Sequence, residues 1–424
     1  MLLGLGILCS TNRRAIDYKL VLSGLAMTIS VCLLVSKVPV INTILEYIGS
    51  GFVTFLGFSS KGAEFLFGDL AKNSNTSTTA HHTLGFIFAF QVLPNILFFA
   101  TVTAALYYLG ILQKIVWIMA WTMSKTMRLS GAESLSAAGN VFLGPTEAPL
   151  LVKPFIEKMT LSELHCMMTV GMSTIAGGVM AAYILILGGN DVASQSAFAS
   201  HLLTASIMNA PTGIIFAKII YPETQPIDSA LVLNKEKFGV NLLDAISKGA
   251  SEGMQLALSV GAMLLAFISV IAMLNYFTGD ILGGFAGINE WVSRISDGQY
   301  TKLSLQFVLG ELCRPIAYLM GVSWQDTLYI GSLIGQKTVL NEFVAYINLQ
   351  EMREQGLLSS KSVLIATYSL CGFSNFSSIA IQFGGISVLA PNQKENVALL
   401  GLRALLAASL ACILTGTLAG IFIV

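Results

Sequence analysis

Residues 129–158 read LSGAESLSAAGNVFLGPTEAPLLVKPFIEK and place two apolar arms on either side of Gly144 and Pro145. Each arm has about 15 residues, which as a helix reaches about 22 Å, less than the ~30 Å hydrocarbon core of a bilayer. We therefore expect a re-entrant hairpin whose tip lies inside the membrane. Because proline fits the first turn of a helix, we expect the second arm to begin near Pro145, with its free N–H groups and positive dipole end facing a cavity.

The composition of the whole chain indicates an integral membrane protein. Of its 424 residues, 54% are hydrophobic and only 11% are charged, whereas soluble domains carry roughly 25% charged residues. The mean hydropathy is +0.75. The formal net charge is zero and no basic cluster occurs, which argues against nucleic-acid binding. Seven stretches without Asp, Glu, Lys or Arg are long enough, or nearly so, to cross a bilayer. They are residues 20–36, 83–113, 164–190, 192–217, 254–279, 362–393 and 404–424.

Two polar segments separate these stretches. We expect residues 59–82 to form an interfacial helix followed by a loop. Residues 221–250 are the largest hydrophilic insert and the natural break between two halves of the chain.

A second segment repeats the organisation of the first hairpin. Residues 325–350 carry a central glycine, Gly335, where we expect the helix to be interrupted, and a carboxylate, Glu342, in an apolar arm. Each hairpin precedes an interrupted span: MSTIAGGV at 172–179 follows the first, and CGFSNFSS at 371–378 follows the second. The order of hairpin, carboxylate and broken span therefore occurs twice, as expected of a secondary transporter built from two repeats. The even spacing allows these repeats to be inverted.

Glu147 and Glu342 are the two carboxylates within these hairpins. A carboxylate at such a depth costs roughly 2.5–3.5 kcal/mol on insertion scales. Because both lie beside helix breaks, we favour a role in binding a polar substrate or in ion coupling. The alternative is a structural pairing with a buried cation or with backbone amides.

Two polar clusters accompany the breaks. Asn140, the carbonyls near Leu143, and Thr174 with Ile175 offer neutral oxygens that suit a monovalent cation such as Na⁺, whereas a divalent ion would need several carboxylates.

The second cluster consists of Phe373, Asn375 and Ser378. An aromatic ring with an amide and a hydroxyl suits a ligand that is half ring and half polyol. The alternative is ordinary packing of membrane helices through Ser and Asn.

The chain resembles the concentrative nucleoside transporter family in its bacterial, sodium-coupled form, from Asn12 to the C-terminus. The most specific motifs are GFIFAFQVLP (85–94), GNVFLGPTEAPLLVKPF (139–155), STIAGGVMAAY (173–183), APTGIIFAK (210–218), NEFVAY (341–346) and CGFSNFSSIAI (371–381). The resemblance implies an all-α polytopic membrane protein with about eight transmembrane helices and two re-entrant hairpins. It also implies a homotrimer in a lipid bilayer, and a bacterial inner membrane is expected.

The resemblance divides the chain into four regions. Residues 1–128 would hold N-terminal spans and the interfacial helix, mainly as scaffold, and residues 129–222 the first transport repeat. Residues 223–300 would be a hydrophilic linker and a long scaffold span, and residues 301–424 the second transport repeat. The transport repeats would move against the scaffold as an elevator.

The resemblance also assigns the binding residues. The hairpin tip recognises the nucleobase through Thr146 and Glu147, with Pro145 beside them. Val179 packs against the base, and Phe373 lines the pocket. The residues implied to bind the ribose are Glu342, Asn375 and Ser378. The residues implied to hold sodium are Asn140, Leu143, Thr174 and Ile175.

One position departs from the family's pattern. Members of this kind usually have glutamine where Pro145 stands, and a glutamine side chain both donates and accepts hydrogen bonds. Losing such a contact costs roughly 1–3 kcal/mol if the base edge stays unpaired. We therefore expect either a water in the gap or a shifted substrate range.

These observations predict a symporter that imports uridine or a related nucleoside down a sodium gradient by alternating access. The alternative is a proton-coupled nucleoside or nucleobase transporter with a base preference altered by Pro145. An enzyme using Glu147 and Glu342 as an acid and base is not favoured, because no nucleophile constellation, metal motif or phosphate loop accompanies them. A passive channel is a further alternative. We expect sodium as the coupling ion and no organic cofactor.

Overall fold

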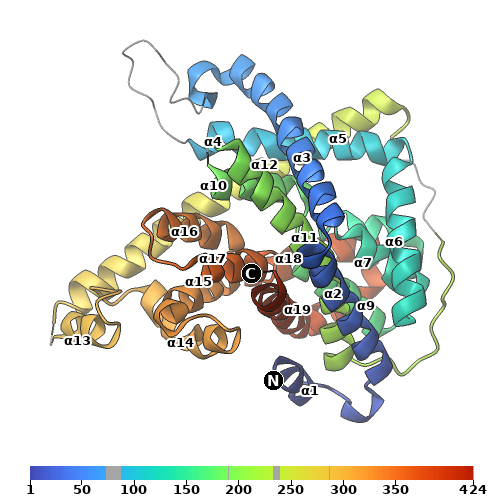
Figure 1. The fold of residues 1–424 in the computed structure, drawn as a ribbon. Coiled ribbons are helices and arrows are strands. Elements are labelled where there is room, and N and C mark those ends of the chain that lie inside the picture. Colours follow the sequence, from blue (N-terminus) through green and yellow to red (C-terminus); the bar gives the residue numbers. More distant parts are fainter. Residues whose placement is uncertain (73–86, 190, 233–238, 286, 424) are drawn as a thin grey trace.

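The computed structural model describes residues 1–72, 87–189, 191–232, 239–285 and 287–423, and every regular element in these ranges is a helix (Figure 1). This confirms the predicted all-α polytopic membrane protein. Within the described part, seven helical segments are long and apolar enough to cross a membrane. They are Tyr18–Lys37, Pro39–Ala71, Phe88–Tyr108, Leu161–Gly188, Val192–Ile220, Leu242–Leu282 and Pro391–Phe422.

The described residues up to Met127 include six α-helices. They are α1 (Leu2–Leu8), α2 (Tyr18–Lys37), α3 (Pro39–Phe67), α4 (Phe88–Gln91), α5 (Leu93–Tyr108) and α6 (Ile111–Met127). The predicted interfacial helix at 59–82 is wrong in its start, because residues 59–67 simply continue α3. The charges of α3 hid this span in the sequence, and residues 73–82 lie outside the described residues. The predicted span at 83–113 is divided into α4 and α5. Its first four residues, 83–86, also lie outside the described residues.

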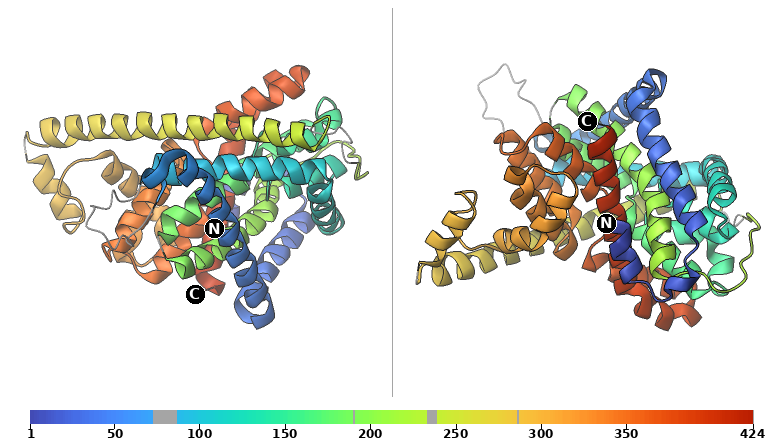
Figure 2. Two further views of the ribbon diagram at one scale, coloured as in Figure 1. Left: turned by 90° about the horizontal axis from the view of Figure 1, so that it is seen from above. Right: turned by 60° about the horizontal axis from the view of Figure 1, so that its bottom comes forward.

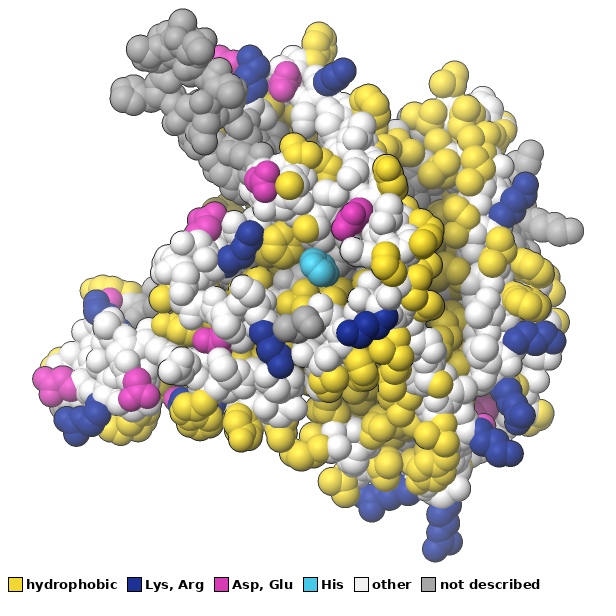
Figure 3. Space-filling view, in the orientation of Figure 1, with side chains coloured by type: hydrophobic (Ala, Val, Ile, Leu, Met, Phe, Trp, Pro, Cys, Tyr) yellow, Lys and Arg dark blue, Asp and Glu magenta, His cyan; other side chains and the backbone are white. Residues whose placement is uncertain are grey.

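Two long helices, α11 (Val192–Ile220) and α19 (Lys394–Phe422), form the centre of the molecule. They pack against each other and against α9 (Leu161–Ser173), and α19 also packs against α17 (Ser360–Leu370) (Figure 1). In the most apolar window of the α9–α10 segment 94% of the residues are buried, and in that of α12 only 22% are. The first segment therefore lies inside the protein, whereas α12 is peripheral. Figure 3 shows broad hydrophobic areas on the surface of one face.

The long helix α12 (Leu242–Asn275) lies along one side of the molecule with α5 beside it (Figure 2). Gly249 and Gly253 allow the close approach: a Cβ on Gly249 would lie 2.5 Å from the Ala104 Cβ, and one on Gly253 would lie 2.8 Å from the Ala100 Cβ. Small residues four apart are a common means of packing membrane helices. After α12 come a π-helical turn (Tyr276–Leu282), α13 (Ile288–Ile295) and α14 (Leu305–Leu319).

The first hairpin has one helical arm and one irregular arm. The helix α7 (Gly131–Gly139) is followed by a non-helical tip, a 3-10 turn (Ala148–Val152) and the short α8 (Lys153–Ile156). The prediction that a helix begins near Pro145 is therefore wrong. The tip is closed by its own backbone, because the N–H groups of Glu147 and Ala148 both donate to the Gly144 carbonyl. These two N–H groups are thus not free to face a ligand.

The second hairpin consists of α15 (Thr327–Val339) and α16 (Glu342–Glu354). The predicted interruption at Gly335 is wrong, because α15 continues through this residue and the chain turns at Leu340 and Asn341. Gly335 serves packing instead, since a Cβ there would lie 2.6 Å from the Leu309 Cβ of α14. The new helix begins after Asn341, whose side chain accepts a hydrogen bond from the Val344 N–H at 3.0 Å.

Both spans predicted to be broken are broken. The first is divided into α9 and α10 (Gly177–Gly188), and the second into α17 and α18 (Phe376–Leu389). The interruptions fall at residues 174–176 and 371–375, inside the segments 172–179 and 371–378 whose glycine and polar residues predict a break.

A buried ion pair anchors the first hairpin. Lys218 of α11 pairs with Glu133 of α7, and its Nζ also donates to the Ser162 Oγ at 3.0 Å. Glu133 belongs to a capping box with Ser130 at the start of α7. The pair, with the bond to Ser162, therefore ties the hairpin to α9 and α11.

We expect Lys218→Met to destabilise the protein by about 3–5 kcal/mol, because it leaves a buried carboxylate without its cation. Thermal unfolding in detergent measures this effect. The matched control is Lys248→Met, which removes an exposed pair with Asp244 at 2.9 Å and is expected to cost at most about 1 kcal/mol. Equal losses in the two variants would contradict the structural role of the buried pair.

Candidate binding site

The two helix breaks contact each other at the centre of the protein. The Phe373 N–H donates to the Thr174 carbonyl at 3.3 Å, which joins the two interruptions directly. Gly372, with φ of +156°, lies so close to the Ser173 carbonyl that a side chain would collide with it. Asn209 of α11 donates to the Cys371 carbonyl at the second break. Sequence reasoning missed this link, because its partners are 162 residues apart.

Glu342 is the central acceptor of the second break. Its carboxylate accepts a hydrogen bond from the Tyr183 hydroxyl and another from the Asn375 Nδ2, both at 2.7 Å. The Asn375 Oδ1 in turn accepts from the Ser378 N–H and hydroxyl at 2.9 and 3.0 Å. The structure thus brings together three predicted residues, all of them buried. Asn375 is also the cap of α18, which fixes its amide at the break.

Tyr183 is a member of this cluster that sequence reasoning did not single out. It lies on α10, is fully buried, and its ring packs against Phe343 and Tyr346 with centroids 4.9 and 4.5 Å apart. Its position between the first broken helix and the second hairpin lets it orient the Glu342 carboxylate. A hint was present in the sequence, since a tyrosine in an apolar span needs a partner for its hydroxyl.

We expect Tyr183→Phe to weaken nucleoside binding by about tenfold, because one hydrogen bond to a charged group is lost. Equilibrium binding of radiolabelled nucleoside to the detergent-purified protein measures this. Tyr346→Phe is the control, because the Tyr346 hydroxyl donates to the Thr367 carbonyl and not to Glu342. An affinity loss in the control but not in Tyr183→Phe would contradict the orienting role.

The oxygens predicted to bind sodium surround the first break. Asn140, Leu143, Thr174 and Ile175 are all at most 4% exposed. The Asn140 Nδ2 donates to the Ser136 carbonyl at 3.0 Å, but its Oδ1 has no hydrogen-bond partner among the described residues. The Thr174 hydroxyl donates to the Val170 carbonyl at 2.8 Å, which leaves its lone pairs free to accept. This donor set fits a monovalent cation, since it is neutral and made of oxygens.

The hairpin tip is anchored to both neighbouring helices. The Gly177 N–H donates to the Phe142 carbonyl at 3.0 Å, which fixes the tip to the start of α10. On the opposite side, a Cβ on Gly385 of α18 would lie 3.2 Å from the Thr146 methyl group. Glu147 holds the turn itself, because its Oε2 accepts from the Gly144 N–H at 2.8 Å.

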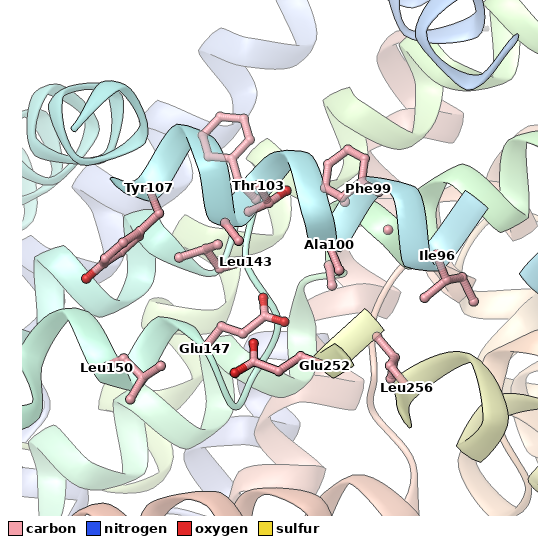
Figure 4. A pocket seen from close by; sticks show the side chains of 15 residues that line it. Ile96, Phe99, Ala100, Thr103, Tyr107, Leu143, Glu147, Leu150, Glu252 and Leu256 are labelled. Atoms are coloured by element: carbon pink, nitrogen blue, oxygen red, sulfur yellow. The ribbon is translucent and has the colours of Figure 1, made fainter. Parts of the chain in front are cut away.

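A cavity of about 280 Å³ opens beside the tip, between the first hairpin, α5, α10 and α12. Figure 4 shows the carboxylates of Glu147 and Glu252 next to each other in this cavity. Glu252 lies on α12 between the two glycines that pack on α5. Sequence reasoning missed it, because only the fold places α12 against the hairpin.

Val179 is predicted to pack against the base, and Phe373 is predicted to line the pocket. Val179 is buried at the start of α10, and Phe373 is partly exposed at the second break. Val179 therefore lies just after the first break, and Phe373 lies in the second break beside the cluster of Glu342, Asn375 and Ser378. The structure joins Glu342, Asn375 and Ser378 by hydrogen bonds. It places Glu147 in the cavity beside α5 and α12, which residues 176–178 at the first break also line.

Hairpins and broken helices that bring polar groups into an apolar protein define a secondary transporter. Three sequence-family models match the chain. The family model for the C-terminus of Na⁺-dependent nucleoside transporters matches residues 201–420, and the one for their N-terminus matches residues 1–70. A family model for nucleoside recognition, called Gate, matches residues 89–190. The chain belongs to the concentrative nucleoside transporter family. It is therefore a transporter and not an enzyme.

Several known proteins are similar over the whole chain. The nucleoside permease NupC of Helicobacter pylori is 38% identical over 98% of this chain and 94% of its own length. Sodium/nucleoside cotransporter 1 of Rattus norvegicus is 36% identical over 98% of this chain and 61% of its own length. A solved structure of CNTnw in an inward-facing substrate-bound state is 37% identical, with a TM-score of 0.88 over 99% of this chain and 95% of that one.

Proposed function

We propose that this protein is a sodium-coupled symporter of uridine or a related nucleoside. The observation that carries the proposal is the hydrogen bond from the Phe373 N–H to the Thr174 carbonyl. It joins the break that carries the polar ligand cluster to the break that carries the neutral oxygen set. An ion that orders Thr174 would therefore also order Phe373 and the second break, where the substrate is proposed to bind.

In this mechanism the ribose hydroxyls would bind the cluster of Glu342, Asn375 and Ser378, while Phe373 and Val179 would flank the base. Thr146 and Glu147, with Pro145 beside them, would approach the base from the hairpin tip. Carboxylate, amide and hydroxyl groups offer both acceptors and donors to a polyol. The Glu342 carboxylate has more lone pairs than the two that accept from Tyr183 and Asn375, and the remaining ones would accept hydrogen bonds from the ribose hydroxyls.

The sodium ion would lie between the first hairpin and the first break, held by Asn140, the Leu143 and Ile175 carbonyls and Thr174. The Asn140 Oδ1 supports this assignment, because it has no partner in the described part of the chain and a buried acceptor without a partner is costly. The ion would supply positive charge for these oxygens and would fix the hairpin tip against α10. By thermodynamic linkage, substrate and ion would then raise each other's affinity.

The four regions would form two parts, a scaffold and a transport part that moves against it. Residues 1–128 and 223–300 would be mainly scaffold, and residues 129–222 and 301–424 would carry the two transport repeats, in inverted orientation. The peripheral position of α12 supports a scaffold role, because its exposed apolar face needs lipid or further copies of the chain. We propose a homotrimer in the bacterial inner membrane, in which the transport repeats move past the scaffold as an elevator.

Equilibrium binding tests the ion assignment. Uridine is titrated into the purified protein in NaCl and in KCl at the same ionic strength. Sodium is expected to tighten binding by about 5- to 150-fold, the usual range of such coupling. Asn140→Ala is expected to lose this sodium effect but to keep the affinity measured in KCl. Equal affinities for unmodified protein in the two salts would contradict sodium coupling.

A further inference from the structure

Gln382 is a buried amide that the proposed binding set does not use. It lies on α18, one turn after Ser378, and is 1% exposed. Its Nε2 donates to the Met168 carbonyl of α9 at 3.0 Å. Its Oε1 has no hydrogen-bond partner among the described residues. A buried acceptor without a donor costs free energy. A ligand that donates a hydrogen bond to the Gln382 Oε1 would remove this cost.

The surroundings of Gly171 show where this amide lies. A Cβ on Gly171 would be 2.5 Å from the Gln382 Nε2, 3.3 Å from the Pro145 Cβ and 3.6 Å from the Asn140 Oδ1. The Gln382 amide, the hairpin tip and the sodium candidate therefore converge on one point. Only a residue without a side chain leaves this point open.

The helix α18 runs from the ribose cluster along the hairpin tip. Ser378 and Gln382 face the same buried side, about 6 Å apart along the axis. The next turn brings Gly385 against Thr146. A nucleoside has a comparable separation between its ribose hydroxyls and the hydrogen-bonding edge of its base. A ligand with its ribose at Ser378 can thus extend its base toward Gln382.

We infer that Gln382 is a specificity-determining residue, whose free carbonyl oxygen accepts a hydrogen bond from an N–H group on the edge of the base. This inference rests on the proposed function and adds the chemistry by which the base is recognised. Pro145, the residue of the hairpin tip that borders the same point beside Gly171, has no side-chain donor or acceptor. The amide comes from α18 instead. The favoured ligands are nucleosides whose base presents an N–H donor, as uridine does at N3.

The test compares uridine with 3-methyluridine, which lacks that donor, in uptake by proteoliposomes. We expect unmodified protein to discriminate against 3-methyluridine. Gln382→Leu is expected to raise the KM for uridine by about tenfold or more, to leave the maximal rate unchanged and to lose the discrimination. Ser387→Ala is the control, because its hydroxyl is also buried and unpaired on α18 but lies beyond the hairpin tip.

A second variant relocates the amide. Positions 145 and 382 border the same point, so the double variant Pro145→Gln with Gln382→Leu is expected to recover part of the lost uridine affinity. This recovery also distinguishes lost recognition from misfolding. An unchanged KM in Gln382→Leu, a loss confined to the maximal rate, or equal use of both nucleosides by unmodified protein would overturn the inference alone. Absence of all nucleoside uptake by unmodified protein would overturn the proposed function, and this inference with it.

Discussion

Replacing Glu342 by glutamine is expected to reduce the kcat/KM of nucleoside uptake by about 100-fold or more. Both carboxylate oxygens accept hydrogen bonds, from Tyr183 and from Asn375, and an amide would place an NH₂ group against one of these donors. The charge that we propose to bind the ribose hydroxyls is also lost. Hydrogen bonds to charged groups contribute about 1.5–3 kcal/mol each, and 1.4 kcal/mol is a factor of ten.

Uptake of radiolabelled uridine into proteoliposomes measures this loss. Glu351→Gln is the matched control, since Glu351 lies on the same helix but is exposed. The elution volume in detergent should be the same for both variants, which shows that the fold is retained. Uptake by Glu342→Gln at the rate of the unmodified protein would refute the assignment of the ribose site.

Glu147→Gln is expected to reduce uptake by about 10- to 100-fold while the protein stays folded. A glutamine can still accept from the Gly144 N–H, which preserves the turn. The substitution removes the charge that we propose the tip presents to the ligand, and a lost charged hydrogen bond is worth about 1.5–3 kcal/mol.

The control for this prediction is Glu252→Gln, measured by the same uptake assay. Glu252 faces the same cavity but belongs to the proposed scaffold, so a much smaller loss is expected. A larger loss in Glu252→Gln than in Glu147→Gln would show that the carboxylate of α12, and not that of the hairpin, is the functional one.

The local interruptions of helices could be predicted from sequence. Residues 172–179 and 371–378 lie within long charge-free stretches and combine glycine with polar side chains, which favour an interruption of a helix. The position of the second hairpin turn could not be read from glycine alone. Gly335 packs against α14, whereas α15 ends at Val339 and Asn341 caps the start of α16. Because asparagine is a preferred N-cap residue, Asn341 was the better sequence signal for the start of the second arm.

The partners of the site residues could not be predicted, because they depend on tertiary contacts. Tyr183 reaches Glu342 across 159 residues, and Gln382 reaches Met168 across 214. Composition misled in α3, where Glu46, Lys61 and Glu64 interrupt an apolar helix that nevertheless continues. In the second arm of the first hairpin, Pro149 and Pro154 remove backbone donors and favour short turns over the expected helix.

Sodium-driven accumulation of uridine tests the central claim most directly. Purified protein is reconstituted into liposomes, and uptake is followed with an inward Na⁺ gradient, with K⁺ in its place, and with a pH gradient alone. The account predicts accumulation above the external concentration only with the Na⁺ gradient, and its loss in Asn140→Ala. Equal uptake in Na⁺ and K⁺, or accumulation driven by the pH gradient alone, would contradict it.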